Sequence, residues 1–389
     1  MSDLLDAAGF STRAVHAGEP AHAPGAPVTN PIFQTSTFYS DPDGGGKVLY
    51  SRYGNGPNTV SVERRVAALE GAEDALAVGS GMAALACAFL SLAKTGDHVV
   101  AGRALYGGTR ALLDVELSRL GIETTYVDYT RGDWTEALRP TTRAVLVEVP
   151  SNPLLRVVEL RPIVEAAHRH GARVVVDSTF ASPVNLRPLE HGADLVMHSA
   201  TKYLGGHSDL SGGVLAGSAA VVGEARARAR VWGPMIDPHA AWLLERGIKT
   251  LAVRMERHNR NGVAVAEWCA GQPGIARVHY PGLPSHPDYA VAARLLDGFG
   301  GMLGIELPGG TEAADRFVSA LRLAKVAPSL GGVETLVSQP RFTSHAAMTP
   351  EEREREGIRD GFVRFSLGIE DAEDIIADIA RALEASGGA

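Results

Sequence analysis

The sequence lacks most of the features that mark secreted, disulfide-bonded or membrane-spanning proteins. Its 389 residues include only two cysteines, Cys87 and Cys269, without the paired spacing of a disulfide framework or a zinc site. No apolar run reaches the length of about eighteen residues that a membrane-spanning helix needs. The N-terminal residues show no basic stretch followed by an apolar one, so no signal peptide is predicted. We therefore expect a cytoplasmic protein without a membrane partner.

Positive charge is also scarce. The chain has 37 Lys and Arg against 45 Asp and Glu, a formal net charge of −8. Such a balance offers no basic surface to a nucleic acid. Among the histidines, His168 and His170 end a helix-like stretch with no acidic ligand spaced to join them, so no metal site is predicted. The remaining expectation is a small-molecule partner.

Short apolar runs alternate with helical patterns through the first two thirds of the chain, as in "RAVLVEVP", "ARVVVDSTF" and "ADLVMHS". This alternation predicts an α/β fold with a mainly parallel sheet between helices. Residues 1–60, rich in Pro, Gly, Ser and Thr, predict an extended arm. Residues 61–245 would form a large domain. The pattern changes near residue 246, and 246–389 predicts a smaller α+β domain.

Polar residues stand at the ends of two predicted strands. Asp177 ends one, and a cluster with Ser199, Thr201 and Lys202 follows the next. In a doubly wound sheet such strand ends line one crevice. A lysine there can form a Schiff base with an aldehyde cofactor, a carboxylate can hold a ring nitrogen protonated, and hydroxyls with the glycine turn "GSGMAA" can bind phosphate. Together these groups predict pyridoxal phosphate as the cofactor.

The same glycine turn supports one remote alternative. "VGSGMAA" fits the dinucleotide fingerprint of a nicotinamide-dependent dehydrogenase, a Gly-x-Gly-x-x-Ala turn after a strand. Asp97 is the candidate for the acidic residue that binds ribose. It precedes the next apolar run, whereas the ribose acid belongs at the carboxyl end of a strand. The fingerprint is therefore weak evidence on its own.

Several longer motifs carry a family resemblance, among them "YSRYGN", "EVPSNPLLRVVE", "SATKYLGGHSDLSGG", "PSLGGVETL" and "FVRFSLGIEDAEDIIADI". The chain resembles the pyridoxal-phosphate-dependent enzymes of cysteine and methionine metabolism from about residue 10 to its end. That group includes cystathionine γ-synthases, cystathionine γ-lyases, methionine γ-lyases and O-acyl-homoserine sulfhydrylases. The resemblance implies the fold type I architecture of pyridoxal-phosphate-dependent transferases, with a smaller C-terminal domain, and a homotetramer of two active-site dimers.

The resemblance also implies roles for individual residues. Lys202 would be the Schiff-base lysine, and Tyr106 would stack on the cofactor ring and move protons. Further contacts to the cofactor are implied for seven residues: Tyr50, Arg52, Gly81, Met82, Asp177, Ser199 and Thr201. Substrate contacts are implied for Asn152, Ser329 and Arg364, with the Arg364 guanidinium holding the α-carboxylate. Tyr50 and Arg52 would reach the phosphate in the neighbouring subunit, which would explain an extended arm.

Departures from the family's patterns bear on the substrate. Enzymes that handle cystathionine commonly carry acidic residues where this chain has Leu49 and Pro328, so the distal ammonium of cystathionine would lack a partner. Methionine γ-lyases usually have a cysteine at the position of Gly108, which weakens a strict methionine specificity. We expect γ-elimination on methionine, homocysteine or a similar small sulfur amino acid, releasing 2-oxobutanoate and ammonia. The alternative is γ-replacement on O-acetyl- or O-succinyl-homoserine, for which Arg341 is a candidate partner of an anionic acyl group.

Overall fold

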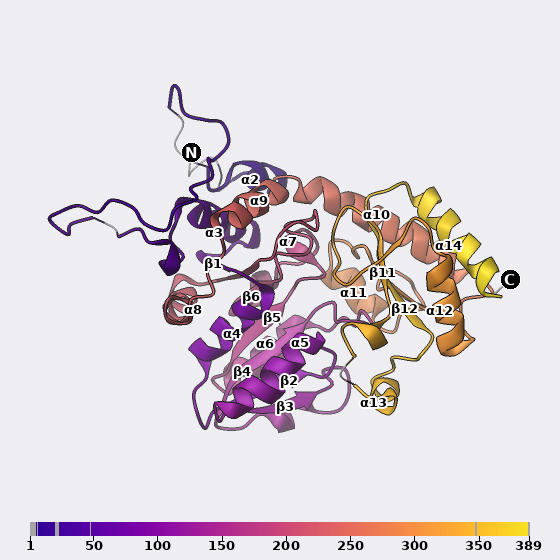
Figure 1. Ribbon diagram of the computed structural model, residues 1–389. Helices are drawn as coiled ribbons and strands as arrows, with labels where there is room; N and C mark the ends of the chain where they lie inside the picture. Colours follow the sequence, from indigo (N-terminus) through magenta and orange to yellow (C-terminus); the bar gives the residue numbers. More distant parts are fainter. Residues whose placement is uncertain (1–4, 6, 20–22, 47, 347, 388–389) are drawn as a thin grey trace.

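A seven-stranded sheet organises the first part of the chain in the computed structural model, which describes residues 5, 7–19, 23–46, 48–346 and 348–387 (Figure 1). The strand order is β1-β7-β6-β5-β4-β2-β3. The strands are β1 (Asp74–Val78), β2 (His98–Gly102), β3 (Glu123–Val127), β4 (Thr142–Glu148), β5 (Arg173–Asp177), β6 (Leu195–His198) and β7 (Gly213–Gly217). Strands β2 to β6 pair in parallel, whereas β7 is antiparallel to both neighbours. The predicted mainly parallel sheet is confirmed.

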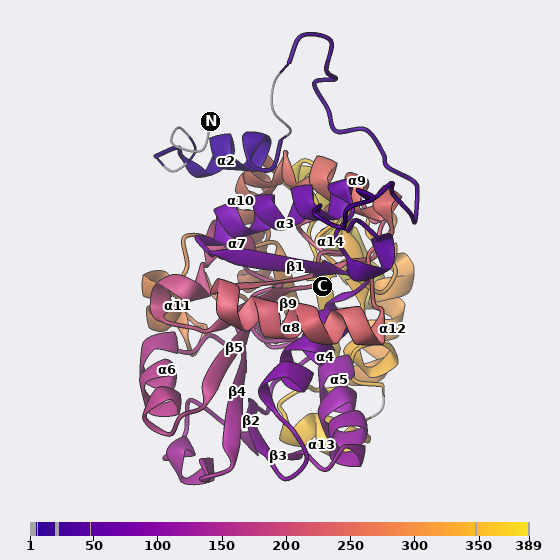
Figure 2. The ribbon, with the colours of Figure 1, turned by 90° about the vertical axis from the view of Figure 1, so that its left-hand side faces the viewer.

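Helices cover both faces of this sheet, so most of its strands are buried and largely apolar on both sides, whereas the edge strand β3 is partly exposed. Helices α3 (Pro57–Glu70) and α9 (Pro238–Ile248) pack on one face. Helices α4 (Gly81–Leu92) and α8 (Ala219–Trp232) pack on the other. Figure 2 shows α3 and α8 on opposite sides of β1. The shorter elements of this part are α5 (Gly107–Ala111), the π-helical η2 (Leu112–Leu117), η3 (Trp134–Ala137), α6 (Leu160–Arg169), α7 (Ser182–Asn185) and η4 (Pro188–His191).

A second, five-stranded sheet has the order β10-β11-β12-β9-β8. Its strands are β8 (Arg277–His279), β9 (Met302–Glu306), β10 (Lys325–Val326), β11 (Leu336–Ser338) and β12 (Phe362–Ser366). Helices α10 (Leu251–Ala270), α12 (Gly310–Ala320) and α14 (Ala372–Ser386) share a core with it. The shorter elements are α11 (Tyr289–Leu295), η5 (Pro340–Phe342) and α13 (Pro350–Arg355). The division of the chain at residue 246 stays a prediction.

The helical part of the chain around residues 247–271 is interrupted near its start. Helix α9 ends at Ile248, and α10 begins at Leu251. Arg254 stabilises the break, because its buried guanidinium donates to the carbonyl oxygen of Gly247 at 2.8 Å and so satisfies a group that the helix end leaves free. Among the described residues, no helix is both long and apolar enough to cross a membrane.

The N-terminal segment is extended only in part. Helix α2 (Phe10–His16) forms where an extended arm was expected, because Ala14 is fully buried and Arg65 donates to the carbonyl oxygens of Ala14 and Val15. Most of the following described segment up to residue 46 has no regular structure and projects from the molecule (Figure 1). A single 3-10 turn, η1 (Ser51–Tyr53), precedes α3.

Candidate active site

A cavity of about 730 Å³ opens at the carboxyl ends of the central strands and is closed on its other side by residues next to the second sheet. Ten of the twelve residues singled out in the sequence line it: Gly81, Met82, Tyr106, Asn152, Asp177, Ser199, Thr201, Lys202, Ser329 and Arg364. They come from segments that lie far apart in the chain. The parallel sheet brings them together because its strands end at one edge.

The turn between β1 and α4 presents backbone N–H groups at one end of the cavity. Ser80 caps α4 by accepting from the Ala83 N–H at 3.1 Å, and the helix begins at Gly81. The space is too small for a side chain, since a Cβ on Gly81 would lie 2.9 Å from the Ser199 Cβ. Among the described residues, the Ser199 hydroxyl has no hydrogen-bond partner, whereas Thr201 accepts from the Gly212 N–H at 3.0 Å. Free N–H groups at a helix start and a free hydroxyl fit a phosphate group.

Lys202 lies beyond β6, with its amine inside the cavity. Its Nζ donates to the Ser329 hydroxyl at 2.7 Å. Burial, and then the Arg364 guanidinium, lower the pKa of Lys202 to about 8. Ser329 has a φ of +88°, a conformation that costs a non-glycine residue energy and is found mostly at functional sites. The lysine is therefore partly uncharged near neutral pH and is held by a strained turn.

Asp177 ends β5 with its carboxylate toward the cavity. Its Oδ1 accepts from the Thr179 N–H at 3.0 Å and from the Thr179 hydroxyl at 2.5 Å. Among the described residues, Oδ2 accepts no hydrogen bond, so it is available to a ligand. Burial raises the pKa of Asp177 above its ordinary value. A buried carboxylate that makes no ion pair within the described residues fits a ligand that brings a protonated ring nitrogen.

Arg364 reaches the cavity from β12 in the second sheet. Its Nη1 donates to the Asn152 amide oxygen at 3.0 Å and its Nη2 to the Ser329 carbonyl oxygen at 3.3 Å. The side chain is 5% exposed, and burial lowers the pKa of Arg364 to about 10. Tyr106 stands opposite, at the start of α5, with 45% exposure. Both side chains line the same cavity.

Two predicted residues do not join this cavity. Tyr50 and Arg52 lie in the N-terminal segment, where the Arg52 Nη1 donates to the Arg230 carbonyl oxygen at 2.7 Å. The Arg52 guanidinium also lies 4.9 Å from the centre of the Tyr53 ring. Their expected contact with a neighbouring subunit stays a prediction.

Arg341 does not line the cavity either. Its Nη2 pairs with Asp315 at 2.5 Å, and its Nε donates to the Gln339 amide oxygen at 2.8 Å. The side chain is thus engaged outside the cavity, so its suggested pairing with an acyl group finds no support in this geometry. The adjacent residues Phe342 and Thr343 do line the cavity.

Glu148 lines the cavity although the sequence analysis did not single it out. It ends β4 and lies directly opposite Asp177 in the parallel pairing of β4 with β5. Its position as the last residue of an apolar run, like that of Asp177, is the signal that would have found it. Burial, and then the Asp177 carboxylate, raise the pKa of Glu148 well above its ordinary value.

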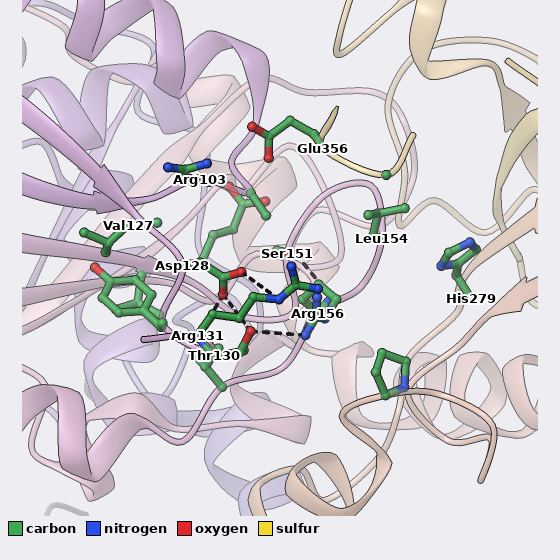
Figure 3. A pocket seen from close by; sticks show the side chains of 18 of the residues that line it. Arg103, Val127, Asp128, Thr130, Arg131, Ser151, Leu154, Arg156, His279 and Glu356 are labelled. Carbon is green, nitrogen blue, oxygen red and sulfur yellow. Dashed lines mark hydrogen bonds and ion pairs between the residues drawn. The ribbon is translucent and has the colours of Figure 1, made fainter. Parts of the chain in front are cut away.

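A second cavity, of about 400 Å³, lies on the other side of Glu148. Figure 3 shows Asp128, Arg156 and His279 among the side chains around it. The Arg156 guanidinium is fixed by Asp288 at 2.5 Å. Glu148 lines both cavities, Ser151 lines only the second and Asn152 only the first, so the end of β4 and the segment that follows it form the wall between them.

The topology of the larger sheet contradicts the alternative of a nicotinamide-dependent dehydrogenase. A dinucleotide fingerprint joins two parallel strands through a helix. Here β1 pairs only with β7 in the sheet, and that pairing is antiparallel. Asp97 precedes β2, where its carboxylate accepts from the Lys94 N–H at 3.0 Å and lies 3.4 Å from Arg143. The glycine turn therefore does not belong to a nicotinamide site.

Comparison with known proteins decides the family. Residues 11–384 match the model of the Cys/Met metabolism PLP-dependent enzymes. The chain belongs to this family. An L-methionine gamma-lyase from Porphyromonas gingivalis is 42% identical, with 97% of each chain covered. An O-succinylhomoserine sulfhydrylase from Pseudomonas aeruginosa is 40% identical, covering 98% of this chain and 96% of that protein.

Solved structures confirm the fold of pyridoxal-phosphate-dependent transferases. A cystathionine gamma synthase from Xanthomonas oryzae superimposes with a TM-score of 0.94 at 38% identity, covering 98% of this chain and 99% of that chain. A cystathionine gamma-lyase from Lactobacillus plantarum superimposes with a TM-score of 0.93 at 36% identity, covering 98% of this chain and 100% of that chain. The predicted cofactor, pyridoxal phosphate, is likewise that of the family. The lysine amine, the open Asp177 oxygen and the backbone N–H turn fit its aldehyde, ring nitrogen and phosphate.

Proposed function

We propose that the protein catalyses γ-elimination on methionine, homocysteine or a similarly small sulfur amino acid. One water is consumed, and 2-oxobutanoate and ammonia are released together with a thiol from methionine or hydrogen sulfide from homocysteine. The residues that line the cavity support this proposal. Its only carboxylates among the described residues are Glu148 and Asp177, at the strand ends, while Pro328, Leu330 and Phe342 supply apolar surface. A substrate with a second ammonium group finds no partner there on this chain, whereas a short thioether tail needs none.

The substrate's α-carboxylate is bound by Arg364, whose planar guanidinium offers two parallel N–H donors. Asn152 and Ser329 accept from that guanidinium and so fix its plane. When bound, pyridoxal phosphate supplies an electron sink for the negative charge that develops on the substrate. Asp177 would keep the ring nitrogen protonated, and Tyr106 would cover the ring. Gly81, Met82, Ser199 and Thr201 would hold the phosphate.

Lys202 moves the protons of the reaction. Its pKa of about 8 leaves part of the amine uncharged near neutral pH, so it can accept the proton from the substrate Cα. Once it has released that proton, it can accept one from Cβ, and the electrons left at Cβ allow the group on Cγ to depart. The Ser329 hydroxyl, 2.7 Å from Nζ, keeps the amine over the cavity between these steps. Tyr106 donates the proton that the departing sulfur requires.

γ-Replacement on O-acetyl- or O-succinyl-homoserine is the second candidate, favoured by the sulfhydrylase that is 40% identical to this chain. In that reaction a thiol or sulfide adds at Cγ after the acyl group departs. Arg364, Lys202 and Tyr106 would serve both reactions in the same way. The two candidates differ in whether product forms without an added nucleophile.

The proposal extends to the assembly. A cytoplasmic homotetramer of two active-site dimers would let Tyr50 and Arg52 of one subunit reach the phosphate bound by its neighbour. The projecting segment before α3 supports this arrangement, because it leaves both residues outside the cavity of their own chain.

The proposed function is tested by the visible absorption of the purified protein with added pyridoxal phosphate, beside Lys202→Ala. A bound-cofactor band that is lost in the variant is expected. L-Methionine should then yield 2-oxobutanoate without any added thiol. Product from O-acetyl-homoserine only when sulfide is present, and none from methionine, would transfer the assignment to γ-replacement. A protein that stays colourless would overturn both candidates.

A further inference from the structure

Glu148 is a buried carboxylate to which the proposed chemistry assigns no task. It is 8% exposed and lies between the two cavities at the end of β4. Among the described residues, no lysine, arginine or histidine lies within ion-pair distance of it. Burying a carboxylate without such a partner is costly unless hydrogen bonds compensate. Its hydrogen bonds therefore indicate what it does.

Two backbone N–H groups provide the compensation. Oε2 accepts from the Tyr106 N–H at 2.8 Å, and Oε1 accepts from the Asn152 N–H at 2.8 Å. The two donors belong to segments 46 residues apart, one leading into α5 and one following β4. Each carboxyl oxygen thus holds one segment.

We propose that Glu148 is a positioning residue, whose carboxylate ties the segment carrying Tyr106 to the segment carrying Asn152. The tie sets the distance between the ring that covers the cofactor and the amide that orients Arg364. The Asn152 amide oxygen accepts from Arg364 at 3.0 Å, so the connection continues into the second sheet. This inference rests on the proposed function, because it gives Tyr106 and Asn152 their significance.

A role for Glu148 in proton transfer is disfavoured by the same geometry. Both oxygens are already engaged with peptide N–H groups, which cannot pass on a proton during turnover. Asp177, opposite it across the β4–β5 pairing, keeps an oxygen without a hydrogen bond. The two carboxylates at neighbouring strand ends therefore have different tasks: Asp177 faces the ligand, and Glu148 faces the backbone.

Glu148→Gln tests the tie, because a glutamine of nearly the same shape has only one oxygen that can accept. Hydrogen exchange is measured by mass spectrometry on the holoenzyme, over peptides containing Tyr106 and Asn152. Exchange should rise by about tenfold or more in at least one of these peptides. The visible circular dichroism of the bound cofactor should weaken, and KM should rise. If Glu148→Gln fails to fold, Glu148→Asp is used, which retains the charge but is too short to reach both amides.

Glu63→Gln is the matched control. Glu63 is a similarly buried carboxylate whose Oε1 accepts from the Ala77 N–H at 3.0 Å and from Arg226 at 2.8 Å, away from the cavity. The Glu63→Gln substitution should lower the stability of the fold. It should change neither the hydrogen exchange of the peptides containing Tyr106 and Asn152 nor the circular dichroism of the cofactor.

The proposal is overturned if Glu148→Gln leaves exchange and circular dichroism as in the wild type, or if Glu63→Gln changes them equally. Loss of one limb of the pH–rate profile in Glu148→Gln would indicate proton transfer instead, and would also overturn it. Exchange measured on protein without added cofactor tests the tie even if the proposed function fails.

Discussion

Arg364 offers the sharpest test of how the substrate is held. Its guanidinium is buried and fixed by Asn152 and Ser329, which leaves a planar pair of N–H donors for a carboxylate. Arg364→Lys keeps the positive charge but replaces the planar pair with a single ammonium group. We expect the variant to lose one of two charge-assisted hydrogen bonds to the substrate.

The expected fall in kcat/KM follows from the free energy that such a hydrogen bond contributes. A hydrogen bond to a charged group contributes about 1.5–3 kcal/mol. At about 1.4 kcal/mol per factor of ten, kcat/KM should fall by about 10- to 150-fold. Because the bond forms on binding and persists through the reaction, most of the fall should appear in KM.

The assay is the release of 2-oxobutanoate over a range of methionine concentrations. Two inhibitors separate the carboxylate contact from general damage: the methionine analogue that lacks the amino group, and the amine that lacks the carboxylate. The inhibition constant of the first should rise with KM, and that of the second should not change. Arg341→Lys is the control, since Arg341 pairs with Asp315 outside the cavity.

The reasoning would be refuted by either of two results. One is an equal loss of affinity for both inhibitors, which would mean that the substitution disturbs the cavity as a whole. The other is a fall in kcat with KM and both inhibition constants unchanged, since carboxylate binding would then not depend on Arg364.

Three further predictions concern acid stability, assembly and the phosphate turn. Burial lowers the pKa of His258 from 6.5 to about 4. Between these two pH values the unfolded chain therefore binds a proton that the folded chain does not, and the free energy of unfolding falls as the pH drops. The melting temperature should depend less on pH in His258→Asn, and an unchanged dependence would contradict the cause. Mixing subunits of Lys202→Ala and Arg52→Ala should restore activity that neither variant has, because one site of each hybrid dimer would be intact; no recovery in verified hybrids would argue against a shared site. Gly213→Ala should weaken cofactor binding by about tenfold, as measured by dialysis. The added Cβ would lie 2.0 Å from the backbone oxygen of Ser80, in the turn before α4, and would crowd that turn. Gly223→Ala, where the Cβ meets nothing within 4 Å, should bind as the wild type does, and equal binding by both would exclude this crowding.

Much of the fold could be predicted because its determinants are local in the sequence. Most strands of the larger sheet are short apolar runs that alternate with helical patterns, and a sheet covered on both faces requires such runs. The lysine, the aspartate and the glycine turn could also be found, since each directly follows or ends such a run. Helix α2 could not, because its formation depends on Arg65, about fifty residues away, which binds its carbonyl oxygens.

The sequence by itself indicated the α/β class, and the polar residues at the ends of predicted strands, with the glycine turn, indicated the cofactor. Tyr106, Asn152, Ser329 and Arg364 were implied only by the family resemblance, and the structure places them in the same cavity. Only the tertiary structure decided that Arg341 faces Asp315 and not the cavity. It alone showed Glu148 between the two segments of the site. Glu148 binds peptide N–H groups, which every residue except proline carries, so no pattern of side chains predicts its partners. Such a contact exists only once the folded backbone has brought Tyr106, 42 residues away in the chain, within hydrogen-bond distance.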